Sequence, residues 1–70
     1  MRSGCVRWFS LRKGYGFIIP DDGRDDVFVH ISELEKAGIA FLIPGKEIGF
    51  EECFDRGRIM ASNLRLRKKS

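Results

Sequence analysis

Two short aromatic segments separated by a dense turn signal constrain the fold of this chain more than any other feature. The segments are residues 13–18, Lys-Gly-Tyr-Gly-Phe-Ile, and residues 27–31, Val-Phe-Val-His-Ile. Between them, residues 20–26 contain one Pro, one Gly and four Asp, which are residue types that favour turns. Two strand-like segments joined by such a turn predict an antiparallel β-hairpin.

Side chains alternate between the faces of a strand, so the predicted hairpin separates rings from aliphatic side chains. One face receives the rings Tyr15, Phe17, Phe28 and His30, and the other receives Ile18, Val27, Val29 and Ile31. An aliphatic face suits a core, so we expect the rings to face water, where flat rings stack on unpaired bases. Gly14 and Gly16 would also let a ligand approach the backbone closely. The alternative is that the rings form the core, because periodicity does not say which face is buried.

Residues 4–10 predict a first strand that contains the adjacent pair Trp8 and Phe9. Neighbouring residues in a regular strand point to opposite faces, so one of the two is exposed or the strand is bulged there. Because the rings downstream are expected outside, we predict that Trp8 points outward. The alternative is a buried Trp8 with Phe9 outside, since tryptophan is often heavily buried.

Residues that interrupt a strand mark where the two strands of the predicted hairpin end. Residues 15–20 are the second predicted strand, which its final proline ends because proline cannot donate a hydrogen bond to a ladder. Residues 25–31 are the third. Ser32 and Glu35 follow with the spacing of a capping box, which predicts one short helical turn that ends near Gly38.

Two further strands are predicted over residues 48–54 and 58–66, with Ile48 and Phe50 on one face of the fourth strand. Five short strands with one interruption after the third predict an all-β fold. The expected architecture is a small five-stranded antiparallel Greek-key barrel of OB type, because closing the sheet removes its exposed edges. Barrels of this type bind oligonucleotides over strands 2 and 3, where the rings fall.

The chain has 70 residues and a net charge of +3, and its charges are separated by sign. Basic residues gather near the N-terminal rings and at residues 65–69, whereas acidic residues gather at 21–26 and 47–52. This separation favours a polyanionic partner. Arg12 and Lys13 would lie beside the ring face and suit phosphates, although solvated loop charges are the plain alternative.

The sequence shows no pattern typical of catalysis or metal binding. Cys5, Cys53 and the single histidine, His30, cannot make a four-ligand zinc set. No paired carboxylates, nucleophile with a base, or phosphate-binding loop stands out, so we expect no enzyme activity, no metal site and no cofactor. With no apolar run that could span a bilayer and no visible signal peptide, we expect a cytoplasmic chain with free thiols.

The order and spacing of these segments resemble the bacterial cold-shock proteins, which consist of a single cold-shock domain. The resemblance covers about residues 4–66, and its blocks are residues 4–9, 13–18, 26–30, 45, 50–51 and 61–64. The block at 13–18 also matches most of the octamer of RNA-recognition-motif domains. In that family the shorter motif precedes the octamer with a helix between them, whereas here residues 27–31 follow it across a turn too short for a helix.

The resemblance implies low-specificity binding of single-stranded RNA and DNA, RNA chaperone activity, and effects on transcription or translation. It implies one cold-shock domain at 1–70, with a barrel over about 4–66 and a basic tail at 67–70. We expect a monomer, with a strand-swapped dimer through residues 32–45 as the alternative. The other class of function left open is a protein-interaction module, because exposed rings also bind peptides. Basic residues beside the rings favour nucleic acid.

Three groups of residues are expected to form the interface. The residues expected to stack on bases are Trp8, Tyr15, Phe17, Phe28 and His30. The residues expected to contact the backbone and the polar groups of the nucleic acid are Arg7, Ser10, Arg12 and Lys13. An outer platform would comprise Phe9, Ile31, Ile39 and Phe41.

Four positions depart from the usual pattern of the family. Ile31 stands where an aromatic residue usually follows the histidine, Ile39 at a loop position that is often Phe, Ser10 in place of a common Asn, and Lys46 in place of a common Gln. The outer platform is therefore poorer in rings and richer in positive charge, so we predict a stronger reliance on phosphates than in relatives. His30 would add a proton-linked contribution if it gained charge as pH falls, although we favour a neutral stacking ring.

Overall fold

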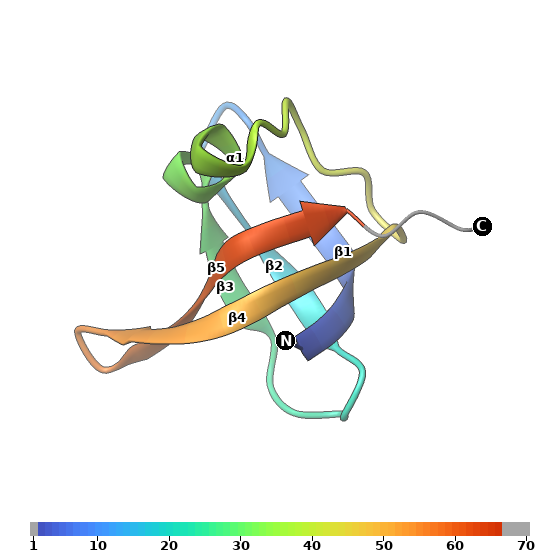
Figure 1. The fold of residues 1–70 in the computed structure, drawn as a ribbon, viewed down its shortest axis with the longest axis vertical. Helices are drawn as coiled ribbons and strands as arrows, with labels where there is room; N and C mark the ends of the chain where they lie inside the picture. The colour runs from blue at the N-terminus through green and yellow to red at the C-terminus, as the bar shows by residue number, and fades with distance from the viewer. Residues whose placement is uncertain (1, 67–70) are drawn as a thin grey trace.

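The computed structural model describes residues 2–66, which form a closed five-stranded barrel with one short helix (Figure 1). The elements are β1 (Arg2–Ser10), β2 (Tyr15–Pro20), β3 (Val27–His30), α1 (Ile31–Ala37), β4 (Glu47–Asp55) and β5 (Arg58–Leu66). Around the barrel the strands follow the order β1-β2-β3-β5-β4. All neighbouring pairs are antiparallel except β3 and β5, which are parallel. The predicted OB-type barrel is confirmed, with one parallel contact where the prediction had none.

The barrel interior is aliphatic, as the alternation in the hairpin predicts. The buried hydrophobic residues are Val6, Ile18, Val27, Val29, Leu34, Leu42, Ile48, Phe50, Ala61 and Leu64. Among the buried residues of the described chain, Phe50 is the one aromatic side chain. The rings of β2 and β3 are therefore left for the outer surface, which excludes the alternative of a ring-filled core.

A bulge in β1 decides which of the two adjacent rings faces outward. Val6 lies opposite Ile18 of β2, but Trp8 lies opposite Phe17, so the register shifts by one residue at Arg7. Residues directly opposite each other in an antiparallel pair share a face, and an extra residue inverts the alternation beyond it. Val6 thus points into the core and Trp8 out of it, as expected.

The structure gives a packing reason for a glycine at position 16, whereas from the sequence we expected a glycine there to admit a ligand. A Cβ at this position would lie 2.6 Å from the Phe9 ring and 2.7 Å from the Phe9 Cα, both on β1. The missing side chain therefore allows β1 and Phe9 to pack closely on β2, while close approach of a ligand at Gly16 stays a prediction. Gly14 has φ +81° in the turn before β2, a conformation that favours glycine.

Helix α1 begins two residues earlier than the capping-box pattern predicts. His30 is the N-cap, and its Nδ1 accepts a hydrogen bond from the backbone N–H of Ser32 at 3.1 Å. Ser32 therefore lies inside the first turn, and Ile31 begins the helix instead of ending β3. The end of the helix is as predicted, because Gly38 is a left-handed C-cap with φ 73°. No helix within residues 2–66 is long and apolar enough to cross a membrane.

The β4–β5 hairpin is only half incorporated in the barrel. Ile48 and Phe50, near the start of β4, are fully buried. Residues 51–59, which form the outer half and the connecting turn, are exposed. Figure 1 shows this outer half extending away from the barrel body, while α1 covers one end of the barrel against β3 and β5.

Candidate nucleic-acid interface

Five rings from three neighbouring strands lie together on the outer face of the barrel. This ring cluster comprises Trp8 of β1, Tyr15 and Phe17 of β2, and Phe28 and His30 of β3. Each member is partly or fully exposed. The structure thus brings together all the side chains that the sequence predicted for base stacking.

Strand register explains why the rings meet. Tyr15 lies directly opposite His30, and Phe17 lies opposite both Phe28 and Trp8. Phe17 occupies the centre, with its ring centroid 5.5 Å from that of Trp8 and 5.8 Å from that of Phe28, both in edge-on contacts. Edge-on aromatic contacts of this kind contribute about 0.5–1.5 kcal/mol each. They hold the rings in place on the outer face of the barrel, where each stays partly exposed.

The pair formed by Tyr15 and Phe28 has a different geometry. Their centroids are 5.6 Å apart and their planes differ by only 25°. His30 continues the row, with its centroid 6.4 Å from that of Phe28 at 32°. Because His30 also accepts the Ser32 N–H through Nδ1, its ring orientation is fixed by the start of α1.

The predicted cations lie around this cluster in two different settings. Arg7, at the bulge, forms an ion pair with Asp26, with 2.6 Å between Nε and Oδ2. Arg12 and Lys13 are exposed in the turn between β1 and β2. Ser10 organises that turn, because its Oγ accepts from the Lys13 N–H at 3.1 Å and its carbonyl accepts from the Gly14 N–H at 2.7 Å. A direct contact of Ser10 with nucleic acid stays a prediction.

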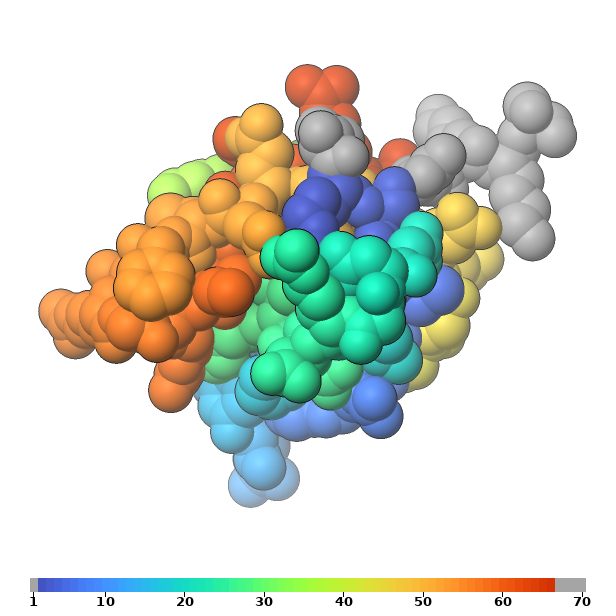
Figure 2. Space-filling model, turned by 90° about the horizontal axis from the view of Figure 1, so that it is seen from below, coloured from blue at the N-terminus to red at the C-terminus, as the bar shows by residue number. Residues whose placement is uncertain are grey.

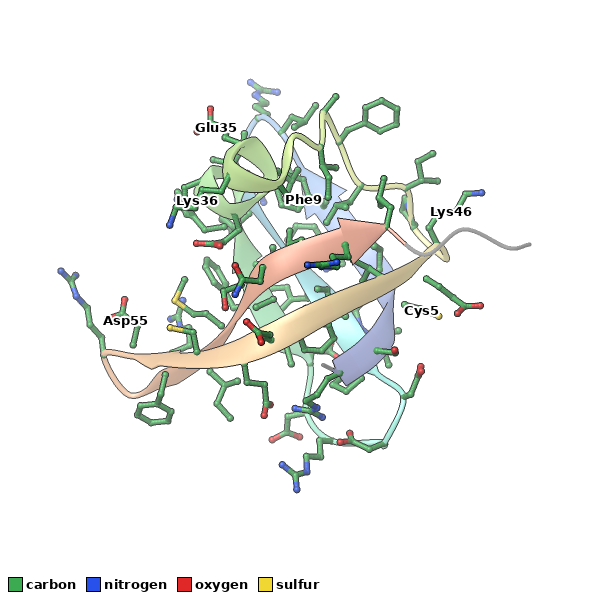
Figure 3. The ribbon with its side chains drawn as sticks, in the orientation of Figure 1. Cys5, Phe9, Glu35, Lys36, Lys46 and Asp55 are labelled. Carbon is green, nitrogen blue, oxygen red and sulfur yellow. The ribbon has the colours of Figure 1, made fainter. Side chains whose placement is uncertain are left out.

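The four residues of the predicted outer platform do not join the ring cluster. Phe9 and Ile39 are partly buried and pack against the core. In the view of Figure 3, Phe9 lies close to α1. Ile31 is partly buried at the start of the helix, and Phe41 is 54% exposed in the connection between α1 and β4. Phe9 and Ile39 therefore pack against the core from its border, and no ring contact found within residues 2–66 links Phe41 to the cluster.

The structure adds a wall to the site that the sequence reasoning missed. A groove of about 1140 Å³ is bounded on one side by the rings and on the other by Phe54, Arg58 and Ile59 of the β4–β5 hairpin. The guanidinium carbon of Arg58 lies 4.9 Å from the centroid of the Phe28 ring. In Figure 2 the hairpin, in orange, and the turn after β2, in teal, stand on either side of a hollow. The available signal was Phe54 and Ile59, two large apolar residues in a hairpin tip that is mostly charged.

Two of the three carboxylates that line the groove, Asp26 and Glu52, form ion pairs with arginines. Arg2 forms ion pairs with both Asp22 and Glu52, in addition to the pair between Arg7 and Asp26. The backbone N–H of Arg24, which donates to Asp22 Oδ1 at 3.1 Å, lowers the pKa of the Asp22 carboxyl, and Arg2 lowers it further. These pairs offset negative charge that would otherwise repel a polyanion.

The described residues hold no group of three or more His, Cys, Asp or Glu side chains that could bind a metal ion. Both cysteines are free thiols. Cys5 lies opposite Glu47 of β4, six residues from Cys53 along the strand. At about 3.3 Å per residue, that separation is too long for a disulfide.

A closed barrel of this topology with a ring cluster on β1–β3 defines a nucleic-acid-binding domain of OB type. The model of the "Cold-shock" DNA-binding domain family matches residues 2–66, and the chain belongs to this family. The family is one of nucleic-acid-binding, non-enzymatic proteins, and the barrel topology separates this chain from RNA-recognition-motif domains.

Relatives of known name support the assignment over most of the chain. The chain is 52% identical over 66 residues to probable cold shock protein y4cH of Sinorhizobium fredii. The matched residues make up 91% of this chain and 96% of that protein. It is 48% identical over 67 residues to cold shock protein CspA of Rhizobium meliloti, with 93% and 97% covered. Glycine-rich protein 2 of Nicotiana sylvestris is 50% identical over 62 residues, which make up 87% of this chain and 29% of that longer protein.

Proposed function

We propose that this protein binds single-stranded RNA and DNA with low sequence specificity and acts as an RNA chaperone. The observation that carries the proposal is the ring cluster, in which five rings lie on one exposed face over three neighbouring strands. A ring stacks on a base only when the face of that base is free, and base pairing within a duplex hides it. Every base has such a face, so stacking tolerates any sequence.

The proposed mechanism has no chemical step. Bases stack on the ring cluster, and each stacked base contributes on the order of 1–3 kcal/mol. Arg7, Arg12 and Lys13 contact the phosphates, and Ser10 holds the turn that presents the last two. Binding the unpaired strand alone shifts a hairpin toward its open form by mass action, without a nucleotide cofactor. Opening of a terminator hairpin or of a paired start site would regulate transcription or translation.

An RNA hairpin with a fluorophore and a quencher at its ends tests the chaperone proposal. Wild-type protein opens the hairpin and raises the fluorescence. A Phe17→Ala variant removes the central ring and requires roughly five- to a hundredfold more protein for the same opening. Leu66→Ala serves as the control, because Leu66 is 54% exposed and lies outside the ring cluster.

Two results would contradict the proposal. Equal opening by wild-type and Phe17→Ala protein would show that the ring cluster does not bind the bases. Failure of the wild-type protein to bind any single strand would instead favour the protein-interaction module, since exposed rings also suit peptides.

A further inference from the structure

The outer half of the β4–β5 hairpin carries an apolar pair that the fold does not use. Phe54 is 72% exposed and Ile59 is 44% exposed. The two residues lie directly opposite each other in the register of β4 and β5, so they share one face of the hairpin. Exposed apolar surface bounded by polar residues is typical of a contact site.

This apolar pair faces the ring cluster. Phe54 and Ile59 line the same groove as Trp8, Phe17 and Phe28, from the opposite wall. The groove, at about 1140 Å³, exceeds the approximately 300–1,000 Å³ of ordinary small-molecule pockets. Because the ring cluster and the hairpin line this one groove, it has room for an extended chain that continues from the rings onto the hairpin.

Arg58 connects the two walls of the groove. Its guanidinium carbon lies 4.9 Å from the centroid of the Phe28 ring. Within residues 2–66, no carboxylate lies within ion-pair distance of this guanidinium. A planar guanidinium stacks on aromatic rings and also binds phosphate through paired N–H groups. Arg58 is therefore placed to hold a phosphate between the ring cluster and Phe54.

The charges around the groove fit the same ligand. Three carboxylates line the groove; Glu52 is paired with Arg2 and Asp26 with Arg7, which leaves the charge of Asp25 against the cations Arg24 and Arg58 of the same groove. Arg24 lines the groove as a further cation, and its side chain is 72% exposed. An apolar ring beside cations on an exposed hairpin matches the chemistry of a nucleotide, which has a flat base and a phosphate.

We propose that the β4–β5 hairpin forms an additional nucleotide subsite, in which a base stacks on Phe54 and Arg58 holds the adjoining phosphate. The subsite lengthens the bound strand beyond the nucleotides that the ring cluster itself holds. It rests on the proposed function, because the same strand must occupy both walls of the groove.

A length series of oligothymidylates tests the subsite. Affinity is measured for strands from about 4 to about 9 nucleotides, within the range of lengths that barrels of this type bind. We expect short strands to bind wild-type and Phe54→Ala protein equally, since they occupy the ring cluster alone. Longer strands should bind wild-type protein roughly five- to a hundredfold more tightly than Phe54→Ala protein. Phe54→Trp should restore the gain with length, and Leu66→Ala should match the wild type.

A second variant examines the phosphate contact. Arg58→Gln should reduce the slope of log affinity against log salt by about 0.7 for the longer strands. The urea midpoint of each variant is compared with that of the wild type as a control for folding. We expect the midpoints to be nearly equal, because surface substitutions usually change stability little.

The outcomes separate the two proposals. If Phe54→Ala binds every length as the wild type does, the subsite does not exist although the proposed function stands. If wild-type protein binds no strand of any length, the proposed function fails and the subsite fails with it.

Discussion

At the scale of single residues, His30 combines two roles that use different parts of its side chain. The ring belongs to the ring cluster beside Phe28, while Nδ1 accepts the Ser32 N–H that begins α1. A residue with both roles links the binding surface to the position of the helix. The capping role could not be predicted from the sequence, because Ser32 and Glu35 offered a standard capping pattern and histidine is a rare N-cap.

Two substitutions at position 30 should separate these roles. His30→Asn keeps an N-cap acceptor but removes the ring, so stability should stay near that of the wild type while affinity for a single strand falls roughly five- to a hundredfold. His30→Phe keeps a ring but removes the acceptor, so affinity should stay near that of the wild type while stability falls by about 0.5–2 kcal/mol.

Urea unfolding and oligonucleotide titration of both variants measure the two effects. A common loss of affinity and stability in each variant would mean that stacking and capping are not separable at this residue.

The orientation of Trp8 and Phe9 could be predicted from the sequence only in part. Their adjacency demanded either an exposed ring or a bulge, and the structure has both. The position of the bulge at Arg7 could not be read from the sequence, because it depends on the pairing of β1 with β2. Phe9 was assigned to the outer platform, but it packs against the core beside Gly16.

At the scale of elements, the turn between β2 and β3 is held by Asp22. Its carboxylate accepts from the Arg24 N–H at 3.1 Å and forms ion pairs with the guanidinium groups of Arg2 and Arg24. The Arg24 N–H and the two guanidinium groups lower the pKa of this carboxyl below its ordinary value. Because the pKa is lower in the folded state, Asp22 stabilises the fold above the ordinary pKa of about 3.9. The stabilisation is lost as pH falls through the lowered value.

Asp22→Asn keeps the hydrogen-bond acceptor for Arg24 but removes the charge. We expect the variant to have a lower urea midpoint than the wild type near pH 7, because the ion pairs with Arg2 and Arg24 are lost. As the pH falls through the lowered pKa of Asp22 the two midpoints should converge, because the wild-type carboxyl then becomes protonated as well. A difference that stays constant over this pH range would show that the charge of Asp22 does not stabilise the turn.

Strand positions were predictable because the signals are local. Alternation, the proline at the end of β2 and the Asp-Arg-Gly turn after β4 placed the strands within a few residues of their bounds. The pairing of β3 with β5 was not predictable, because it joins segments that are distant in sequence and runs parallel. That pairing brings β5 beside the ring cluster, which places Arg58 over Phe28.

At the scale of the whole molecule, barrel closure divides the candidate site between two chain segments. The wall formed by β1–β3 was evident from alternation, since its rings occur within 23 residues, from Trp8 to His30. The wall formed by the β4–β5 hairpin depends on closure, so the sequence alone did not reveal Phe54 and Arg58 as neighbours of the rings. The stronger reliance on phosphates that the sequence suggested stays a prediction. A role for the tail at 67–70, which contains three basic residues, also stays a prediction, because the tail lies outside the described residues.

The most direct test of single-strand binding by the ring cluster is the fluorescence of Trp8, the one tryptophan of the chain. The protein is titrated with a short pyrimidine-rich DNA strand and, separately, with the duplex of that strand. Because the ring centroid of Trp8 lies 5.5 Å from that of Phe17 on the exposed face, we expect the single strand to quench the fluorescence as bases stack. We expect the duplex to leave it nearly unchanged. Equal quenching by both forms, or none by either, would contradict single-strand binding by this surface.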